Sequence, residues 1–333
     1  MTSSPSDDSY REQLANAKRF IESNDRFLVV SHLNPDGDAV SSTLAAGWIL
    51  EKLGKPFVLI NEGRCPAKFG CLPGFDRLLS YADDELPAGP FGCVISVDCA
   101  DEARCGEVKQ LFAVDVRLLN IDHHPTNTRF GSVQLIRADA AATVELLYDL
   151  ALEMKLPIDR SFAELIYTGL LTDTGGFRFS NTTPRVMRIA ADLLGYGVNG
   201  SWLAEHLLAK MTRAHITLLK RALNSLSFAY GGKACWMTVS AEDMAECEAS
   251  SEDLDGLIDY PRNIEGVEVG ILFKQYGENS VKVSFRSNSY VDVAAIAQSF
   301  GGGGHVRASG CTIEGRLQDV VEHVVKEVGQ SFS

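Results

Sequence analysis

The feature that most constrains the fold is an apolar segment that runs directly into a cluster of ionisable side chains. Phe27–Val30 has the composition of a buried strand, and His32, Asp36 and Asp38 follow shortly after it. Residues 39–60 then have the pattern of a helix and a second strand. This order predicts a right-handed β-α-β unit with parallel strands. Open sheets of that kind bind ligands at the carboxyl edge, where the cluster falls.

The loop between the first strand and the helix has two readings. Pro35 and Gly37 favour a tight turn that lets its side chains converge. An imidazole and two carboxylates that converge could bind a divalent metal ion. The same residues could instead form an ordinary polar turn with Asp38 as the N-cap of the helix. The loop alone does not separate the two.

The pattern recurs along the chain. The apolar strand predicted at residues 91–97 ends in Asp98, and the one at residues 117–121 ends in Asp122, His123 and His124. A carboxylate at the end of a buried strand is costly unless a charge or a dipole meets it. A metal ion or the N-terminus of a helix could do so. Asp173 adds a fourth acidic position, at the end of the helix predicted over residues 161–172.

These ligands are carboxylates and imidazoles without a thiolate, a set that suits Mn²⁺ or a similar first-row ion better than structural zinc. The set is too large for one ion with open positions. It suits two ions roughly 3.5–4 Å apart that share a carboxylate, the arrangement used for in-line displacement at phosphorus. The candidate residues are His32, Asp36, Asp38, Asp98, His123, His124 and Asp173.

Charge and composition limit the partners. The chain of 333 residues has a net charge of −13, which argues against binding long nucleic acid through general counterion release. Its eight cysteines form no CxxC pair, so we expect reduced, buried thiols. No apolar run is long enough to span a membrane, and the N-terminus lacks the features of a secretory signal. We therefore expect a cytoplasmic protein without a membrane partner.

The C-terminal part changes to alternating strands, with a hairpin around residues 276–279. The glycine run Gly301–Gly304 precedes His305 and could let backbone amides approach a phosphate, or could be a flexible linker. It is not a P-loop, because no Lys-Ser/Thr follows in register. We predict an α/β protein with an N-terminal parallel sheet and flanking helices, and a smaller C-terminal α/β domain with a mixed sheet. The predicted boundaries are 1–195, a helical linker at 196–218, and 219–333.

The motifs together resemble the DHH phosphoesterase superfamily: the loop His32–Asp38, the strand-end Asp98, the triplet Asp122-His123-His124 and Asp173-Thr174-Gly175. The resemblance implies that Asp98 bridges two ions, that Asp122 orients a histidine, and that His124 lies near the substrate phosphate. It implies the remaining ligands as follows: His32 and Asp36 on the first ion; Asp38, His123 and Asp173 on the second.

Residues 284–287 and 301–305 resemble the DHH-associated substrate domain of the NrnA-like branch, which comprises bifunctional oligoribonucleases and 3′,5′-bisphosphonucleoside phosphatases. The resemblance implies that a guanidinium and an imidazole bind the nucleotide phosphate and that the glycines shape a base pocket. The substrate-binding candidates are Arg286, Ser287, Gly302, Gly303, Gly304 and His305.

The function that these features predict is hydrolysis of phosphoesters in short oligoribonucleotides and bisphosphonucleosides. Two Mn²⁺ ions would serve it, with Co²⁺ or Mg²⁺ as substitutes, and the cleft would close between the two domains. Hydrolysis of linear or cyclic dinucleotide signals would use the same residues. A non-catalytic nucleotide-binding protein would predict a broken ligand set, which the sequence does not show. A homodimer is left open.

Overall fold

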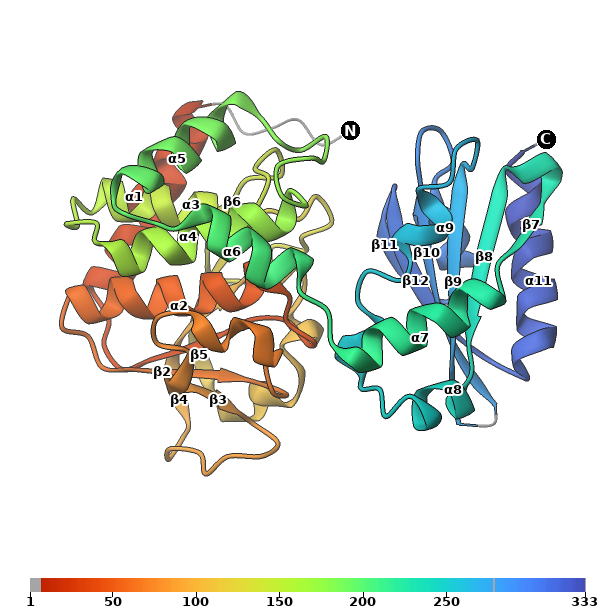
Figure 1. Cartoon of the computed structure of the whole chain (residues 1–333). Helices are drawn as coiled ribbons and strands as arrows, with labels where there is room; N and C mark the ends of the chain where they lie inside the picture. Colours follow the sequence, from red (N-terminus) through yellow and green to blue (C-terminus); the bar gives the residue numbers. More distant parts are fainter. Residues whose placement is uncertain (1–6, 278, 333) are drawn as a thin grey trace. The chain divides into compact units, whose positions relative to one another are not determined.

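The computed structural model describes residues 7–277 and 279–332, which divide into two compact units between Lys210 and Met211 (Figure 1). Each unit has its own sheet. The boundaries predicted for the two domains and the linker stay predictions. Residues 196–218, predicted as a helical linker, contribute helices to both units.

The first unit is built on a parallel sheet. Its strands are β1 Phe27–Val30, β2 Phe57–Asn61, β3 Leu78–Ser80, β4 Phe91–Val97, β5 Phe112–Asp122 and β6 Val133–Ile136. They lie in the order β3-β2-β1-β4-β5-β6, and every pairing is parallel. The predicted α/β class and parallel N-terminal sheet are therefore confirmed.

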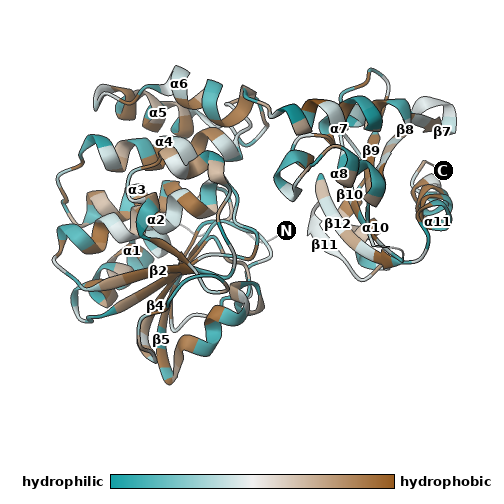
Figure 2. Cartoon of the chain, turned by 60° about the horizontal axis from the view of Figure 1, so that its bottom comes forward, coloured by the Kyte–Doolittle hydropathy of each residue, from teal (hydrophilic) through white to brown (hydrophobic). Residues whose placement is uncertain are grey.

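The two central strands, β1 and β4, are buried on both faces, which is why their sequences are nearly continuous apolar runs. In Figure 2 the strands are coloured mainly as hydrophobic, with α1 to α4 on one face. The helices are α1 Asp7–Glu22, α2 Gly37–Lys52, α3 Thr143–Glu153, α4 Arg160–Asp173, α5 Pro184–Gly195 and α6 Gly200–Ala204. Short helical turns are η1 Ala67–Cys71, η2 Phe75–Arg77, η3 Glu102–Leu111 and η4 Glu205–Ala209. One apolar core lies under α1 to α4, and a second lies on the other face with η3.

The strand order places the switch point of the sheet between β1 and β4. From β1 the chain goes to β2 and β3 on one side, and then returns to β4, β5 and β6 on the other. The loops after β1 and β4 therefore diverge and leave a crevice at the carboxyl edge. His32 follows β1 and Asp98 follows β4, so both lie at this edge.

The second unit has a mixed sheet, as predicted. Its strands are β7 Ser227–Ala229, β8 Ala234–Val239, β9 Val269–Tyr276, β10 Ser280–Ser287, β11 Gly303–His305 and β12 Ala308–Glu314. The order is β11-β12-β10-β9-β8-β7, in which β8 and β9 are parallel and the other neighbours antiparallel. The hairpin predicted at residues 276–279 connects β9 and β10.

Helices cover both faces of the second sheet. They are α7 Arg213–Asn224, α8 Ala241–Glu246, α9 Asp259–Arg262, α10 Val293–Ser299 and α11 Leu317–Gln330, with the turns η5 Tyr230–Gly232 and η6 Ser251–Leu254. One core gathers residues of α10 and α11 with the sheet, and the other gathers residues of α7. No described helix has the length and apolar character needed to cross a membrane.

Candidate metal centre

The candidate ligands predicted from four separate motifs lie together at the carboxyl edge of the first sheet. His32, Asp98 and the triplet Asp122–His124 come from the ends of β1, β4 and β5. Asp36 is the N-cap of α2, and Asp38 lies in its first turn. Asp173 is the last residue of α4. The turn reading of the first loop is thus partly correct, but the N-cap is Asp36, which leaves the Asp38 carboxylate directed elsewhere.

Asp98 lies at the centre of this cluster. One of its oxygens, Oδ2, is 3.5 Å from His32 Nε2, and the other, Oδ1, is 3.6 Å from His123 Nε2. The side chain is almost fully buried. Three groups of side chains could each hold an ion: His32, Asp36 and Asp98; Asp38, His123 and Asp173; Asp98, His123 and His124. Asp98 belongs to two of these groups. The group that lacks it, Asp38, His123 and Asp173, shares His123 with one of the other two.

His32 and His123 both direct Nε2 toward the Asp98 carboxylate. Nδ1 of His32 is 2.7 Å from the carbonyl of Leu33, and Nδ1 of His123 is 3.2 Å from that of Ala140. A carbonyl accepts only, so in both rings Nδ1 must carry the proton that it donates. This leaves both Nε2 atoms available to a metal ion, as in most metal-binding histidines.

The pKa values of Asp38 and Asp173 are raised in this cluster. Burial, and then the charges of Asp98 and Asp36, raise the pKa of Asp38 well above its usual range. Burial, and then the charges of Asp38, Asp36 and Asp98, do the same to the pKa of Asp173. Both groups therefore favour a proton when no cation is near.

The pKa of Asp98 shifts the other way. Burial opposes its ionisation, but the hydrogen bond with His32 and the charges of His123 and His124 lower its pKa overall. Its backbone has φ of +54°, a left-handed conformation that is uncommon outside glycine. Strain of this kind is concentrated at functional sites, where the surrounding structure maintains it.

His124 is held by a separate pair of contacts. Its Nδ1 is 2.7 Å from Asp122 Oδ1, and the other oxygen of Asp122 accepts a hydrogen bond of 2.6 Å from Asn127. Burial tends to lower the pKa of His124, but the hydrogen bond to Asp122 and the charge of Asp98 raise it. The arrangement fixes the ring and favours its protonated form.

The carboxylates of the cluster have only histidines as ion-pair partners in the described part of the chain. Within residues 7–277 and 279–332, no Lys or Arg side chain forms an ion pair with Asp36, Asp38, Asp98, Asp122 or Asp173. The buried thiols of Cys99 and Cys105 lie nearby in sequence but belong to none of the three groups. A set of carboxylates and imidazoles that lacks both a thiolate and a basic partner fits one or two hard or borderline divalent ions.

The substrate-binding candidates lie in the second unit. Arg286, Ala308 and His305 pair in one row across β10, β12 and β11, so their backbones are neighbours. The side chain of His305 lies outside the described part of the chain. Arg286 is mostly buried, which lowers its pKa, and it donates to the carbonyl of Phe285. Ser287 donates 2.7 Å to the carbonyl of Val291, so its hydroxyl also stabilises a turn.

Two glycines of the run, Gly302 and Gly304, lie where the backbone of β12 leaves no room for a side chain. A Cβ at Gly302 would lie 2.3 Å from the carbonyl oxygen of Gly310, and one at Gly304 would lie 2.6 Å from that of Ala308. Glycine therefore permits β11 to approach β12 closely. Gly303 has open space around its Cα and is exposed. A role of the three glycines in a base pocket stays a prediction.

Sequence reasoning missed the residues that hold the ligands. Thr143 donates to Asp98, and Asn127 donates to Asp122, although neither stands in a recognisable motif. Gly169 was also missed: a Cβ there would lie 2.6 Å from Asp38 Oδ1, so glycine lets α4 pass this carboxylate. Such contacts depend on residues distant in sequence, and no local pattern reveals them.

The chain belongs to the DHH family of phosphoesterases. The model of the DHH family N-terminal domain matches residues 26–170, and the DHHA1 domain matches residues 231–333. Bifunctional oligoribonuclease and PAP phosphatase NrnA of Thermus thermophilus is 35% identical over 92% of this chain and 90% of that protein. The protein of the same name from Bacillus subtilis is 27% identical over 89% of this chain and 91% of its own.

A solved structure supports the fold over nearly the full length. An exopolyphosphatase-related protein from Bacteroides fragilis matches with a TM-score of 0.87 and 23% identity, covering 99% of this chain and 97% of that one. Together with the cluster of carboxylates and histidines, these similarities define a hydrolase of phosphoester bonds.

Proposed function

We propose that this protein uses two Mn²⁺ ions to hydrolyse short oligoribonucleotides and 3′-phosphoadenosine 5′-phosphate to nucleoside monophosphates. The observation that carries the proposal is the position of Asp98, with one oxygen toward His32 and the other toward His123. A carboxylate that faces two sets of ligands is what a pair of ions requires. The names of the NrnA relatives supply the substrates.

The ligands divide into two sets around Asp98. His32 and Asp36 would hold the first ion, and Asp38, His123 and Asp173 the second. The choice of Mn²⁺ rests on the ligand types, and Co²⁺ or Mg²⁺ could replace it. Such a pair of ions supplies a hydroxide nucleophile near neutral pH and offsets charge on the phosphoryl oxygens.

His124 has the features of a proton donor. Because Asp122 accepts from its Nδ1, the other nitrogen, Nε2, is the one that can act on a substrate. Burial tends to lower the pKa of His124, but the hydrogen bond to Asp122 and the charge of Asp98 raise it above its usual value, which favours the protonated ring. We assign Nε2 the transfer of a proton to the leaving oxygen, with Asp122 holding the ring in place.

The second unit would bind the nucleotide. Arg286 keeps its charge even where burial lowers its pKa, because a guanidinium ionises far above neutral pH. A charged, mostly buried guanidinium suits a phosphate that it can bind with two hydrogen bonds. Ser287, the glycines 302–304 and His305 complete the proposed binding set.

The test is Mn²⁺-dependent product release from a 3′,5′-bisphosphonucleoside, a 5′-phosphorylated RNA dinucleotide and pyrophosphate, measured side by side. We expect cleavage of the first two and little of the third, with all activity lost in EDTA and restored by Mn²⁺. Cleavage of pyrophosphate alone would contradict the proposed substrates while leaving the metal centre intact. A cyclic dinucleotide in the same series separates the signalling alternative.

Two further predictions concern the whole protein. A homodimer would appear as twice the monomer mass in sedimentation equilibrium. A cytoplasmic location is consistent with substrates that arise from RNA turnover, and cell fractionation would test it.

A further inference from the structure

One short segment contacts candidate ligands that come from three different elements. Residues 140–145, here called the support segment, include the residues just before α3 and the first residues of that helix. Three cluster residues make hydrogen bonds with it: Asp38 from α2, Asp98 after β4, and His123 after β5. The support segment lies outside the four motifs that carry the family resemblance.

Asp38 is bound by the backbone of the support segment. Its Oδ2 accepts 2.6 Å from the amide of Thr143, and its Oδ1 accepts 3.2 Å from that of Val144. The residue at the N-cap of α3, Ala142, has no side chain that could cap the helix. The carboxylate of Asp38 therefore caps α3 from another helix, and the start of α3 in turn fixes Asp38.

The side chain of Thr143 reaches Asp98. Its Oγ1 donates 2.9 Å to Asp98 Oδ1, the same oxygen that faces His123 Nε2. Thr143 is fully buried, and a β-branched side chain has few χ1 states. The hydroxyl thus holds the carboxylate plane in the orientation that divides its two oxygens between His32 and His123.

Hydrogen bonds of Glu145 and Asn181 hold the support segment in place. Glu145, almost fully buried, accepts 2.6 Å from the amide of Ala141 through Oε1, and 3.1 Å from Arg185 Nε through Oε2. Asn181 donates to the carbonyls of Ala141 and Asp173. The segment is therefore braced against α5 and against the backbone of another candidate ligand.

We propose that Thr143 is a positioning residue of the metal centre, whose hydroxyl orients the shared carboxylate of Asp98 while its amide holds Asp38. The proposal rests on the proposed two-metal function. Partners of this kind around metal ligands typically change metal affinity by about 10–100-fold when they are removed.

The test compares four proteins: the wild type, Thr143→Val, Thr143→Ser and Thr168→Val. Valine keeps the shape and removes the hydroxyl, whereas serine keeps the hydroxyl. Thr168 is the matched control, because it is also fully buried but its hydroxyl has no partner among the described residues. Free Mn²⁺ is followed by electron paramagnetic resonance during titration, and unfolding is measured in EDTA.

We expect Thr143→Val to bind Mn²⁺ about 10–100-fold more weakly than the wild type. Thr143→Ser should stay within a few-fold, and Thr168→Val should match the wild type. A purely structural role would lower the melting temperature in EDTA without changing the affinity. If Thr143→Val fails to fold, Mn²⁺ affinity is measured in Thr143→Ala instead, which removes the hydroxyl without placing a methyl group beside Asp98.

Two results would overturn the inference: wild-type affinity in Thr143→Val, or an equal loss in Thr143→Ser. Both leave the proposed function standing if the wild type binds two ions. A wild type that binds no Mn²⁺ would instead refute the metal centre itself, so the two failures are distinguishable.

Discussion

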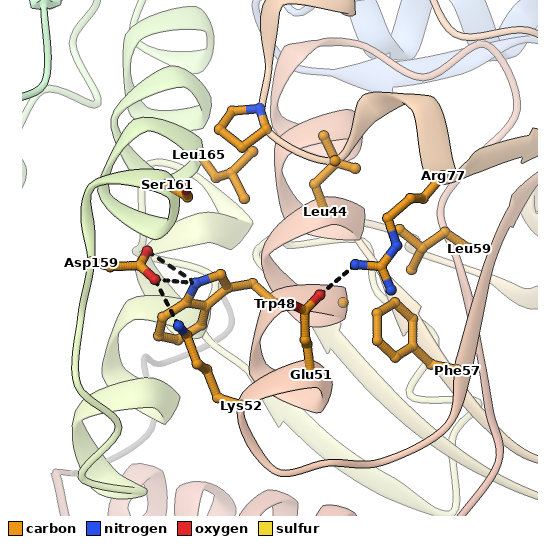
Figure 3. A pocket seen from close by; sticks show the side chains of 13 residues that line it. Leu44, Trp48, Glu51, Lys52, Phe57, Leu59, Arg77, Asp159, Ser161 and Leu165 are labelled. Atoms are coloured by element: carbon orange, nitrogen blue, oxygen red, sulfur yellow. Dashed lines mark hydrogen bonds and ion pairs between the residues drawn. The ribbon is translucent and has the colours of Figure 1, made fainter.

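Acidic side chains at the two ends of α2 differ in whether they pair with a Lys or Arg side chain. The helix is about 24 Å long at 1.5 Å per residue. Its amino end carries Asp36 and Asp38 into the cluster, where no Lys or Arg of the described chain forms an ion pair with them. Its carboxyl end carries Trp48, Glu51 and Lys52 into a cavity of about 260 Å³ (Figure 3).

At the carboxyl end each acid has a cation. Lys52 Nζ lies 2.8 Å from Asp159 Oδ2, and Arg77 pairs with Glu51. Asp159 also accepts from the indole nitrogen of Trp48 at 3.0 Å, as the dashed lines in Figure 3 show. The guanidinium of Arg77 lies 4.5 Å from the centre of the Phe57 ring. The charges of this cavity balance among themselves.

The amino end of α2 must stabilise its carboxylates without the ion pairs that are found at the carboxyl end. The helix dipole stabilises carboxylates at an amino end, but typically by no more than about 1 kcal/mol each at exposed positions. That is too little to offset burial and the charges of neighbouring carboxylates, which raise the pKa of Asp38 at this end of α2. The same two causes raise the pKa of Asp173, which comes from the carboxyl end of α4. Among the described residues no Lys or Arg forms an ion pair with the carboxylates of the cluster, whereas the acids at the carboxyl end of α2 are paired with Lys52 and Arg77.

The largest expected difference between the two ends of α2 is in turnover. Asp98→Asn removes the charge shared by the two proposed ions, and we expect activity on the bisphosphonucleoside to fall by about 10³-fold, the equivalent of about 4 kcal/mol. Asp159→Asn, the same change at the other end of α2, should leave turnover near the wild type. Steady-state kinetics with Mn²⁺ checks both, and circular dichroism checks the fold. Near wild-type activity in Asp98→Asn would rule out the bridging role.

The second prediction concerns pH and metal removal. Burial first, and then neighbouring carboxylates, raise the pKa of Asp38 and Asp173 above 3.8, so folding binds protons there. That stabilisation is present at low pH and is lost as pH rises through the raised values. The pKa values of His32 and His124 are raised from 6.5, so their contribution is lost above 6.5 as pH rises further. Both effects lower the stability of the metal-free protein as pH rises through the raised pKa values of these groups.

Mn²⁺ should reverse that trend, because it displaces these protons and binds more tightly as pH rises. At 100 times the dissociation constant, each ion adds about 2.7 kcal/mol. The gap in melting temperature between Mn²⁺ and EDTA should therefore widen with pH, as differential scanning fluorimetry can measure. Asp173→Asn should narrow that gap. A metal-free protein whose melting temperature rises over the same range would contradict the pKa directions.

The smallest effect belongs to the carboxyl end. Asp159 is also the N-cap of α4, accepting 3.0 Å from the amide of Phe162. Asp159→Ala should cost about 1–2 kcal/mol of unfolding free energy. Glu51→Gln, which weakens an exposed pair, should cost no more than about 1 kcal/mol. Denaturant unfolding measures both, and neither should change Mn²⁺ affinity. A loss of Mn²⁺ binding in Asp159→Ala would mean that the two ends of α2 are coupled.

Residue order alone specified the α/β class and nominated the residues of the candidate site. An apolar strand that ends in ionisable residues can be read locally, because strand periodicity and burial leave a direct trace in residue order. Asp98 and the triplet Asp122–His124 could therefore be placed at one sheet edge from residue order alone. The short edge strands β3 and β6 were not predicted, since a few residues carry little pattern.

The three-dimensional packing of the chain fixed which atoms meet. It gave the N-cap of α2 to Asp36 and turned Asp38 toward the amides of Thr143 and Val144. It brought the hydroxyl of Thr143 to the oxygen of Asp98 that faces His123. Hydrogen bonds act over about 3 Å, and the chain folds residues far apart in sequence to that distance. A sequence pattern can thus nominate the ligands, but the packing of α3 and α4 against the sheet orients them.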